Sequence, residues 1–106
     1  MTPTGLLLEA VTPLALSVKV TQERWNLIVS VKHPVMNGHE DDVRAARERP
    51  DEVRRSRRDP DVLLFHRLER PGRWTCAVIR RTGDDGLLIT AYPADAVKEG
   101  ERIWAR

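Results

Sequence analysis

The sequence predicts an α+β fold in which two N-terminal helices pack on an antiparallel β-sheet of about four strands. Two observations lead to this prediction. Apolar residues in the first half of the 106-residue chain recur at helical spacing, whereas the second half has short apolar runs between Pro- and Gly-containing turns. Helices followed by antiparallel strands are typical of an α+β layout. We expect the helices to cover one sheet face and the other face to offer a polar groove.

The first helix is expected over about residues 22–33. Thr21 is a favourable N-cap, because its hydroxyl can accept a backbone N–H of the first turn. Trp25 begins an apolar stripe at helical spacing. His33 precedes Pro34, and the residue before a proline is pushed out of the helical region, so the helix should end there.

A second helix is expected over residues 38–49, where the acidic residues come first and the arginines last. That order suits the helix dipole, and Pro50 ends the segment. Upstream of both helices, residues 1–13 are interpreted as an arm or a poorly paired strand, and residues 14–20 as a short strand. The chain is long enough for a single domain spanning residues 1–106.

The second half of the chain is expected to form a meander of antiparallel strands. Its apolar runs are separated by turn-forming segments at Asp59–Asp61, Pro71–Gly72 and Gly83–Gly86. The strands are expected over residues 51–58, 62–68, 73–81 and 87–92.

Positive charge is concentrated in one stretch of the chain. The protein has 15 Arg and 3 Lys at a net charge of +2, and residues 43–58 alone carry seven Arg against three acidic residues. A basic stripe of this kind is the usual electrostatic footprint of a protein that binds phosphate backbones. The alternative is a solvated helix face and loop, partly neutralised by the acidic residues. On the first interpretation, the residues that bind RNA are Arg44, Arg47, Arg57 and Arg58.

The single cysteine and the hydropathy pattern exclude several classes of protein. Cys76 cannot form an internal disulfide or a multi-cysteine metal site, and its apolar surroundings favour a buried structural thiol over a nucleophile. No apolar stretch approaches the ~18 residues of a membrane span, and the N-terminal segment lacks the basic start of a signal peptide. We therefore expect a cytoplasmic protein that does not bind a membrane.

Three histidines are candidates for proton transfer, because the imidazole pKa lies near neutrality. His33 ends the first helix, where it either acts chemically or only caps the last carbonyls. His39 is interpreted as a solvated residue beside Glu40, and His66 as a half-buried strand residue. The histidines and the acidic run 40–42 lack the spacing of a known metal site, so we expect no metal and no other cofactor.

Hydroxyl groups occur at two places that suit phosphate chemistry. Thr90 and Tyr92 share one face of the last predicted strand, where they either orient a phosphate or are ordinary strand formers. Ser56 lies between Arg54–Arg55 and Arg57–Arg58, which makes it a plausible phosphate contact. A histidine, one or two arginines and a hydroxyl are sufficient for metal-free RNA cleavage, because the substrate's 2′-hydroxyl is the nucleophile.

The order of several segments resembles a known group of proteins. These segments are Trp25–Ile28, His33–Pro34, Pro50–Ser56, Asp59–Phe65, Ile89–Pro93 and Ile103–Trp104. Over about residues 21–104 they resemble small bacterial and phage proteins of a toxin-like kind. Those proteins are grouped with the barnase, EndoU, colicin-tRNase and RelE-like superfamily of metal-independent ribonucleases.

The resemblance implies a RelE/barnase-like fold, with two helices on one face of the sheet and RNA on the opposite face or its edge. It also implies three active-site groups: a histidine after the first helix, a basic residue, and a Ser or Thr in the last strand. Carried over, these are His33, Arg54 or Arg55, and Thr90. The further candidates are Ser56, Tyr92 and Lys98.

The leading hypothesis is a toxin-like, metal-independent ribonuclease that cleaves RNA by 2′-hydroxyl attack and has a cognate antitoxin or immunity protein as a partner. The second hypothesis is a catalytically inactive module of the same fold that binds RNA or a protein. The third is a metal-dependent hydrolase that uses His33, His39 and the acidic run 40–42.

Overall fold

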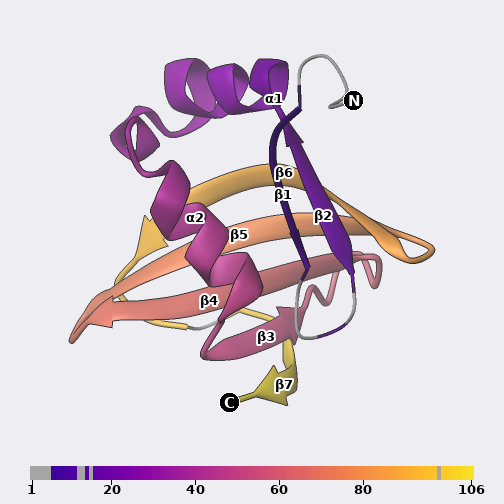
Figure 1. Cartoon of the computed structure of the whole chain (residues 1–106). Coiled ribbons are helices and arrows are strands. Elements are labelled where there is room, and N and C mark those ends of the chain that lie inside the picture. Colours follow the sequence, from indigo (N-terminus) through magenta and orange to yellow (C-terminus); the bar gives the residue numbers. More distant parts are fainter. Residues whose placement is uncertain (1–5, 12–13, 15, 98) are drawn as a thin grey trace.

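The architecture is a seven-stranded mixed β-sheet with its helices on one face (Figure 1). The structure is a computed structural model that describes residues 6–11, 14, 16–97 and 99–106. The spatial order of the strands is β1-β2-β6-β5-β4-β3-β7. The strands are β1 (Leu6–Val11), β2 (Ser17–Thr21), β3 (Glu52–Arg55), β4 (Val62–Arg70), β5 (Arg73–Thr82), β6 (Asp85–Ala94) and β7 (Glu101–Ala105).

The predicted architecture is wrong, although the general α+β class holds. Two strands precede the helices, the sheet has seven strands rather than about four, and it is mixed because β2 runs parallel to β6. The parallel pairing joins segments far apart in the chain, which local periodicity does not report. Gly86 lies at this pairing, where a Cβ atom would come within 2.8 Å of the Ile79 side chain and 3.1 Å of the Val18 side chain.

The meander β3–β6 lies close to the segments predicted from the turn residues. All three pairings within it are antiparallel, and one register row joins His66, Cys76 and Tyr92 across β4, β5 and β6. The expected strand 51–58 is shorter, because it pairs only over Glu52–Arg55. The meander therefore fixes which side chains become neighbours across the sheet.

The first helix begins at a side-chain cap and ends in a wide π-type turn, and two further helical pieces follow it. Its pieces are α1 (Gln22–Leu27), the π-helical η1 (Ile28–Lys32), the 3-10 helix η2 (Pro34–Met36) and α2 (Glu40–Glu48). The Thr21 hydroxyl accepts the Arg24 backbone N–H at 3.2 Å, as expected of an N-cap. The His33 N–H donates to the Ile28 carbonyl at 2.6 Å, which closes the π turn just before Pro34. The chain therefore leaves the helix at His33.

One face of the sheet carries the apolar core. Val53, Phe65, Ala77 and Ala91 form a register row across β3, β4, β5 and β6, and all four are fully buried. Val43 of α2 belongs to the same cluster, so this is the face that the helices cover. Burial of each larger aliphatic or aromatic side chain in such a cluster stabilises the fold by roughly 1.5–3 kcal/mol.

The opposite face is not the open polar surface expected from the sequence. The chain leaves β6 and must reach β7, which pairs with β3, so a crossing segment, described at residues 95–97 and 99–100, passes over β5, β4 and β3 (Figure 1). Leu64, His66 and Cys76 point to this side, yet their exposed fractions are only 5%, 3% and 0%. The crossing segment therefore turns part of this face into a second, smaller interior.

Gly100 ends the crossing, and its conformation admits only glycine at low cost. Its φ is +82°, and a Cβ atom would lie 2.5 Å from the Arg55 carbonyl oxygen. We predict that Gly100→Ala lowers the free energy of unfolding by about 2–4 kcal/mol, because backbone strain and a backbone clash add together. Urea denaturation followed by circular dichroism measures this loss.

Gly72→Ala is the matched control for this prediction. Gly72 also has a positive φ, +75°, but a Cβ atom at this position would meet nothing within 4 Å. Only the backbone cost of about 1 kcal/mol is expected there. Equal losses in the two variants would show that the approach of Gly100 to Arg55 is unimportant.

Candidate active site at the edge of strand β6

A row of four chemically active side chains crosses the sheet face opposite the helices. Glu52 pairs with His66, His66 with Cys76, and Cys76 with Tyr92, so the four lie in register on β3, β4, β5 and β6. Directly opposed residues of antiparallel strands share one face. A carboxylate, an imidazole, a thiol and a phenol therefore follow one another across the sheet.

His33 joins the β6 end of this row. Its ring packs against the Tyr92 ring with centroids 5.6 Å apart and planes tilted by 42°. The contact is possible because, among the described residues, β2 pairs with β6 only over Asp85–Leu87, which leaves the following part of the β6 edge to η1 and η2. The structure thus brings together two of the predicted catalytic residues, His33 and Tyr92.

Lys32 and Thr90 complete a small polar cluster around that contact. The Lys32 ammonium donates to the Ile89 carbonyl at 3.2 Å, so a positive charge is held at the β6 edge next to His33. The Thr90 side chain shares a sheet face with Tyr92, and its buried hydroxyl has no hydrogen-bond partner in the described part of the chain. An unpaired buried hydroxyl carries a desolvation cost, which a hydrogen bond to a ligand would relieve.

Burial and neighbouring groups set the protonation states along the row. Burial, together with the Cys76 thiol, raises the pKa of Tyr92, which therefore stays protonated and able to donate. Burial also raises the pKa of the Cys76 thiol to about 12, against a smaller opposing effect of its hydrogen bond with Tyr92. Burial lowers the pKa of His66, only partly offset by the charge of Glu52, so His66 is neutral at pH 7. Half-buried His33 is the histidine of the site that solvent reaches.

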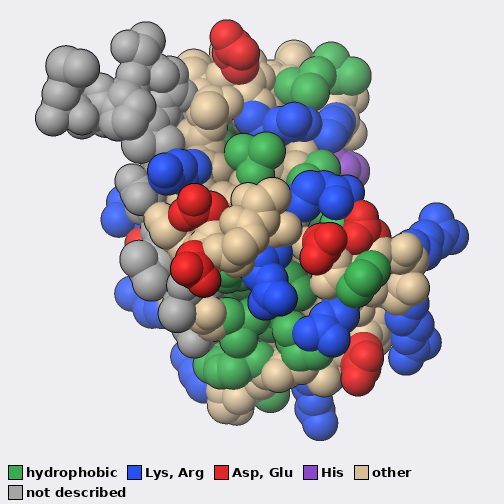
Figure 2. Space-filling view, turned by 90° about the vertical axis from the view of Figure 1, so that its right-hand side faces the viewer, with side chains coloured by type: hydrophobic (Ala, Val, Ile, Leu, Met, Phe, Trp, Pro, Cys, Tyr) green, Lys and Arg blue, Asp and Glu red, His purple; other side chains and the backbone are tan. Residues whose placement is uncertain are grey.

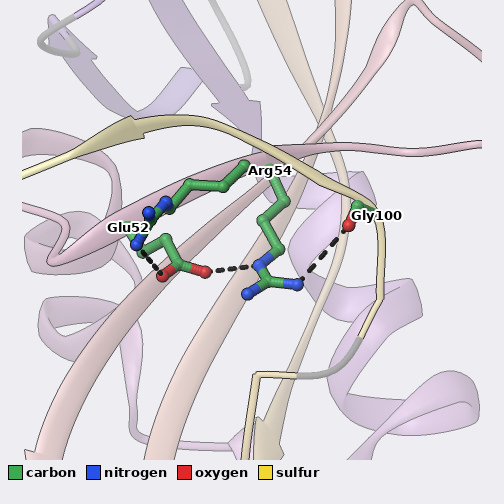
Figure 3. Close-up of polar contacts among 4 residues, drawn as sticks. Glu52, Arg54 and Gly100 are labelled. Atoms are coloured by element: carbon green, nitrogen blue, oxygen red, sulfur yellow. Dashed lines mark hydrogen bonds and ion pairs between the residues drawn. The ribbon is translucent and has the colours of Figure 1, made fainter.

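The predicted arginines Arg54 and Arg55 lie away from His33. Arg54 is on β3, three strands from β6, which is roughly 14 Å at the usual spacing between strands. Figure 3 shows its guanidinium between the Glu52 carboxylate and the Gly100 carbonyl. The Arg54 Nη1 atom donates to the Gly100 carbonyl at 3.4 Å. Arg55 follows Arg54 in the strand and is therefore on the helix-covered side. Both arginines remain candidates for substrate contact elsewhere, but neither is part of the cluster at β6.

Arg47 is a core residue, which corrects its predicted role in RNA binding. Its exposed fraction is 0%, and its Nε donates to the Val43 carbonyl one helical turn earlier at 3.3 Å. Burial lowers the pKa of Arg47 to about 10. The sequence misled here because a helix with arginines on successive turns places one of them on the apolar stripe. Arg44, by contrast, is exposed and paired with Glu48 at 2.9 Å.

Arg57 and Arg58 lie with Ser56 around a cavity at the loop between β3 and β4. The cavity has a volume of about 360 Å³, and Glu99 and Gly100 of the crossing segment form its other wall. The Ser56 hydroxyl accepts the Arg58 backbone N–H at 3.2 Å, which fixes the loop, and both arginine side chains are exposed. Lys98, the remaining predicted RNA contact, lies outside the described residues.

The basic stretch 43–58 does not form one continuous surface. Its arginines are divided among α2, the core, β3 and the loop after β3. Figure 2 shows Lys and Arg side chains spread over one face of the molecule, with Asp and Glu side chains among them. The distribution of charge therefore does not locate a functional site, whereas the side chains around His33 form a defined cluster.

The metal-dependent hypothesis depends on a ligand cluster that the described residues do not form. His39 is bonded through Nδ1 to Asp42 at 2.8 Å, on the first turn of α2. Within the described residues, no three His, Cys, Asp or Glu side chains converge as metal ligands.

Lys32 and Glu99 are the residues that sequence reasoning missed. Lys32 precedes the His33–Pro34 pair, and a basic residue next to a helix-ending histidine was the available signal. Glu99 has no comparable signal, because its place beside His66 and Tyr92 depends on the passage of the crossing segment over the sheet.

Comparison of the chain with protein-family models, with curated proteins and with solved structures finds no match. The helices in the described part of the chain are also too short or too polar to cross a membrane.

Thiol labelling tests the interior formed by the crossing segment. Because Cys76 is fully buried and its pKa is raised to about 12, we predict that a disulfide-exchange reagent at about pH 8 leaves the folded protein unlabelled and labels it fully in urea. Labelling of the folded protein at the rate of free cysteine would contradict this placement.

The pH dependence of stability tests the burial of His66. Its pKa is lowered in the folded state from the ordinary value of 6.5, so the unfolded chain takes up the proton first as the pH falls. The contribution of neutral His66 to the free energy of unfolding is fully present above about pH 6.5 and is lost as the pH falls below that value. The free energy of unfolding then falls by up to ~1.4 kcal/mol per pH unit. We predict that His66→Gln flattens the fall in unfolding free energy between about pH 6.5 and pH 5. His39→Gln makes the same change at a surface histidine and is the matched control, and an equal flattening in both variants would contradict this role of His66.

Proposed function

We propose that the protein is a cytoplasmic, metal-independent endoribonuclease of the toxin-like kind, with its active centre at His33, Lys32, Tyr92 and Thr90. The observation that carries the proposal is the packing of the solvent-reachable His33 ring on Tyr92, beside the unpartnered Thr90 hydroxyl and the Lys32 ammonium. A proton-transfer group, two hydroxyls and a cation are the groups that cleavage by an internal nucleophile requires.

Each group has a definite role in the proposed reaction. The His33 imidazole takes the proton of the RNA 2′-hydroxyl, and the 2′-oxygen attacks the adjacent phosphorus. A 2′-O–P bond forms, the P–O5′ bond breaks, and the departing 5′-oxygen takes a proton from solvent, which leaves a cyclic phosphate and a 5′-hydroxyl. The Lys32 ammonium stabilises the additional negative charge on the phosphate oxygens. Tyr92 keeps its proton because of its raised pKa. Its hydroxyl exchanges the hydrogen bond with Cys76 for one donated to a phosphate oxygen, with Thr90 beside it.

The positions of Arg54 and Arg55 favour a second candidate function. A ribonuclease of the proposed kind benefits from a guanidinium at the phosphate, yet Arg54 is held by Glu52 at the far side of the sheet. A module that binds RNA or a partner protein without cleaving it has no need of such a guanidinium at His33. In either case the proposed partner is a cognate antitoxin or immunity protein that covers the β6 edge.

Cleavage of RNA in EDTA tests the catalytic proposal. We predict that purified protein cleaves total RNA or tRNA in EDTA and leaves 2′,3′-cyclic phosphate ends, and that His33→Ala reduces the rate by about 10²–10⁴-fold, the usual contribution of a general base. Tyr92→Phe should reduce the rate by a smaller factor, because only a hydrogen bond to the phosphate is lost.

His39→Ala is the matched control for a histidine of the same chain outside the site. It should cleave like the wild type. Absence of cleavage by the wild type, with RNA binding that weakens steeply as salt is raised, would instead support the non-catalytic module. Equal cleavage by wild type and His33→Ala would remove His33 from the active centre.

A further inference from the structure

A small cavity lies beside the candidate active centre, on the face that the crossing segment covers. It has a volume of about 160 Å³ and is lined by His66, Tyr92, Ala94, Ala96 and Glu99. Tyr92 is shared with the His33 contact, so one phenol ring separates the cavity from the proposed site of cleavage. A group bound in the cavity would therefore contact the same Tyr92 side chain that packs against His33.

His66 marks this cavity as a place for a polar ligand. Its exposed fraction is 3%, and its Nδ1 atom is buried without a hydrogen-bond partner in the described residues. A buried polar atom left unpaired costs about 1–3 kcal/mol, and a ligand that pairs it recovers that cost. The T-shaped contact of His66 with Trp74, at 6.5 Å between centroids, fixes the imidazole in place.

The walls of the cavity combine a carboxylate acceptor with a flat, apolar lining. Glu99 lines the cavity and is exposed, so its carboxylate lies at the rim. An ionised carboxylate only accepts hydrogen bonds, and so the ligand edge beside Glu99 must donate. Ala94 and Ala96 leave room beside the Tyr92 ring for another ring.

We propose that this cavity binds a nucleobase that carries an exocyclic amino group and thereby selects such bases over uracil next to the cleaved bond. The inference rests on the proposed function, since it names part of the RNA that the same site takes. Neutral His66 pairs with a ring nitrogen of the base, and Glu99 accepts the amino group, as carboxylates do from cytosine N4. Uracil instead presents carbonyl oxygens on both sides of its N–H, which the carboxylate repels.

The dimensions and surroundings agree with a single base. Pockets for drug-sized ligands usually measure about 300–1,000 Å³, so a cavity of about 160 Å³ is suited to one small ring system rather than to a whole nucleotide. Glu99 also lines the larger cavity of Arg57 and Arg58, which therefore adjoins the first one along the crossing segment. The backbone phosphate of a neighbouring nucleotide can be bound there by the exposed arginines.

Binding of uncleavable RNA separates this inference from catalysis. Short 2′-O-methyl oligonucleotides of A, C or U lack the attacking hydroxyl, so their affinity is measured without cleavage, for example by fluorescence anisotropy. We expect the wild type to bind the A and C oligonucleotides about tenfold tighter than the U oligonucleotide, the size of one good base-specific contact. We expect Glu99→Gln to remove most of that preference, because the amide replaces one acceptor oxygen with a donor.

Two further variants sharpen the result. Glu101→Gln makes the same change of charge two residues away, at an exposed position of β7, and should keep the wild-type preference. Ala96→Leu fills the cavity without changing charge and should lower the affinity for A and C to that for U. Since Glu99 is exposed, its variant is expected to fold even if the Ala96 variant does not.

The outcomes distinguish the cavity from the catalytic proposal. A preference for A and C that depends on Glu99, in a protein that does not cleave RNA, would support the cavity and overturn the catalytic role of His33. Cleavage of natural RNA with equal affinity for the three oligonucleotides, or a preference untouched by Glu99→Gln, would overturn the cavity alone. Binding to none of the oligonucleotides would overturn the cavity as a base site, and cleavage of natural RNA in EDTA would still decide the catalytic proposal separately.

Discussion

The pairing of β7 with β3 is the constraint on which the rest of this structure depends. Because β6 and β3 are separated by β5 and β4, a chain that leaves β6 and pairs with β3 must cross the sheet. The helices already cover one face, so the crossing uses the other. This single connection buries His66 and Cys76. Burial lowers the pKa of His66 and raises the pKa of Cys76. The same connection supplies Glu99 to both cavities. A glycine in the left-handed region at position 100 lets the crossing end against the Arg55 backbone.

A second constraint acts at the opposite end of the row. The first helix ends in a π turn, which widens the final turn by one residue relative to an α-helix and is followed at once by Pro34. The turn leaves Lys32 on the Ile89 carbonyl and His33 on the Tyr92 ring, at a stretch of β6 that β2 does not pair in the described structure. The site is thus formed where a helix end meets an unpaired strand edge, and both halves are fixed by backbone hydrogen bonds.

Local signals in the sequence were sufficient for individual elements and for single residues within them. Thr21 as an N-cap, the helix end at His33, the turns of the meander and the burial of Cys76 all depend on a residue and its immediate neighbours, and all are confirmed. The overall architecture was wrong because it depends on partners distant in the chain. The parallel contact of β2 with β6 needs Gly86 beside Val18, and β7 is only five residues long, so neither has a periodic signature. The prediction that Arg47 binds RNA failed for a related reason, since only the packing of α2 decides which of the helix's arginines is buried.

The same distinction explains which parts of the site the sequence contained. His33, Thr90 and Tyr92 could be picked out from the sequence by their chemistry. The structure places them at one edge of the sheet, because the helix end and the alternation of side chains along β6 are both set by neighbouring residues. The arginines were assigned from charge density, and charge density is a property of the chain rather than of a surface. Once folded, Arg54 is held by Glu52, and the exposed Arg57 and Arg58 lie beside the crossing segment instead. A substrate that contacts both regions must therefore extend across four strands, from His33 at β6 to the loop after β3. An extended single strand has that reach, whereas a small anion at either end has not.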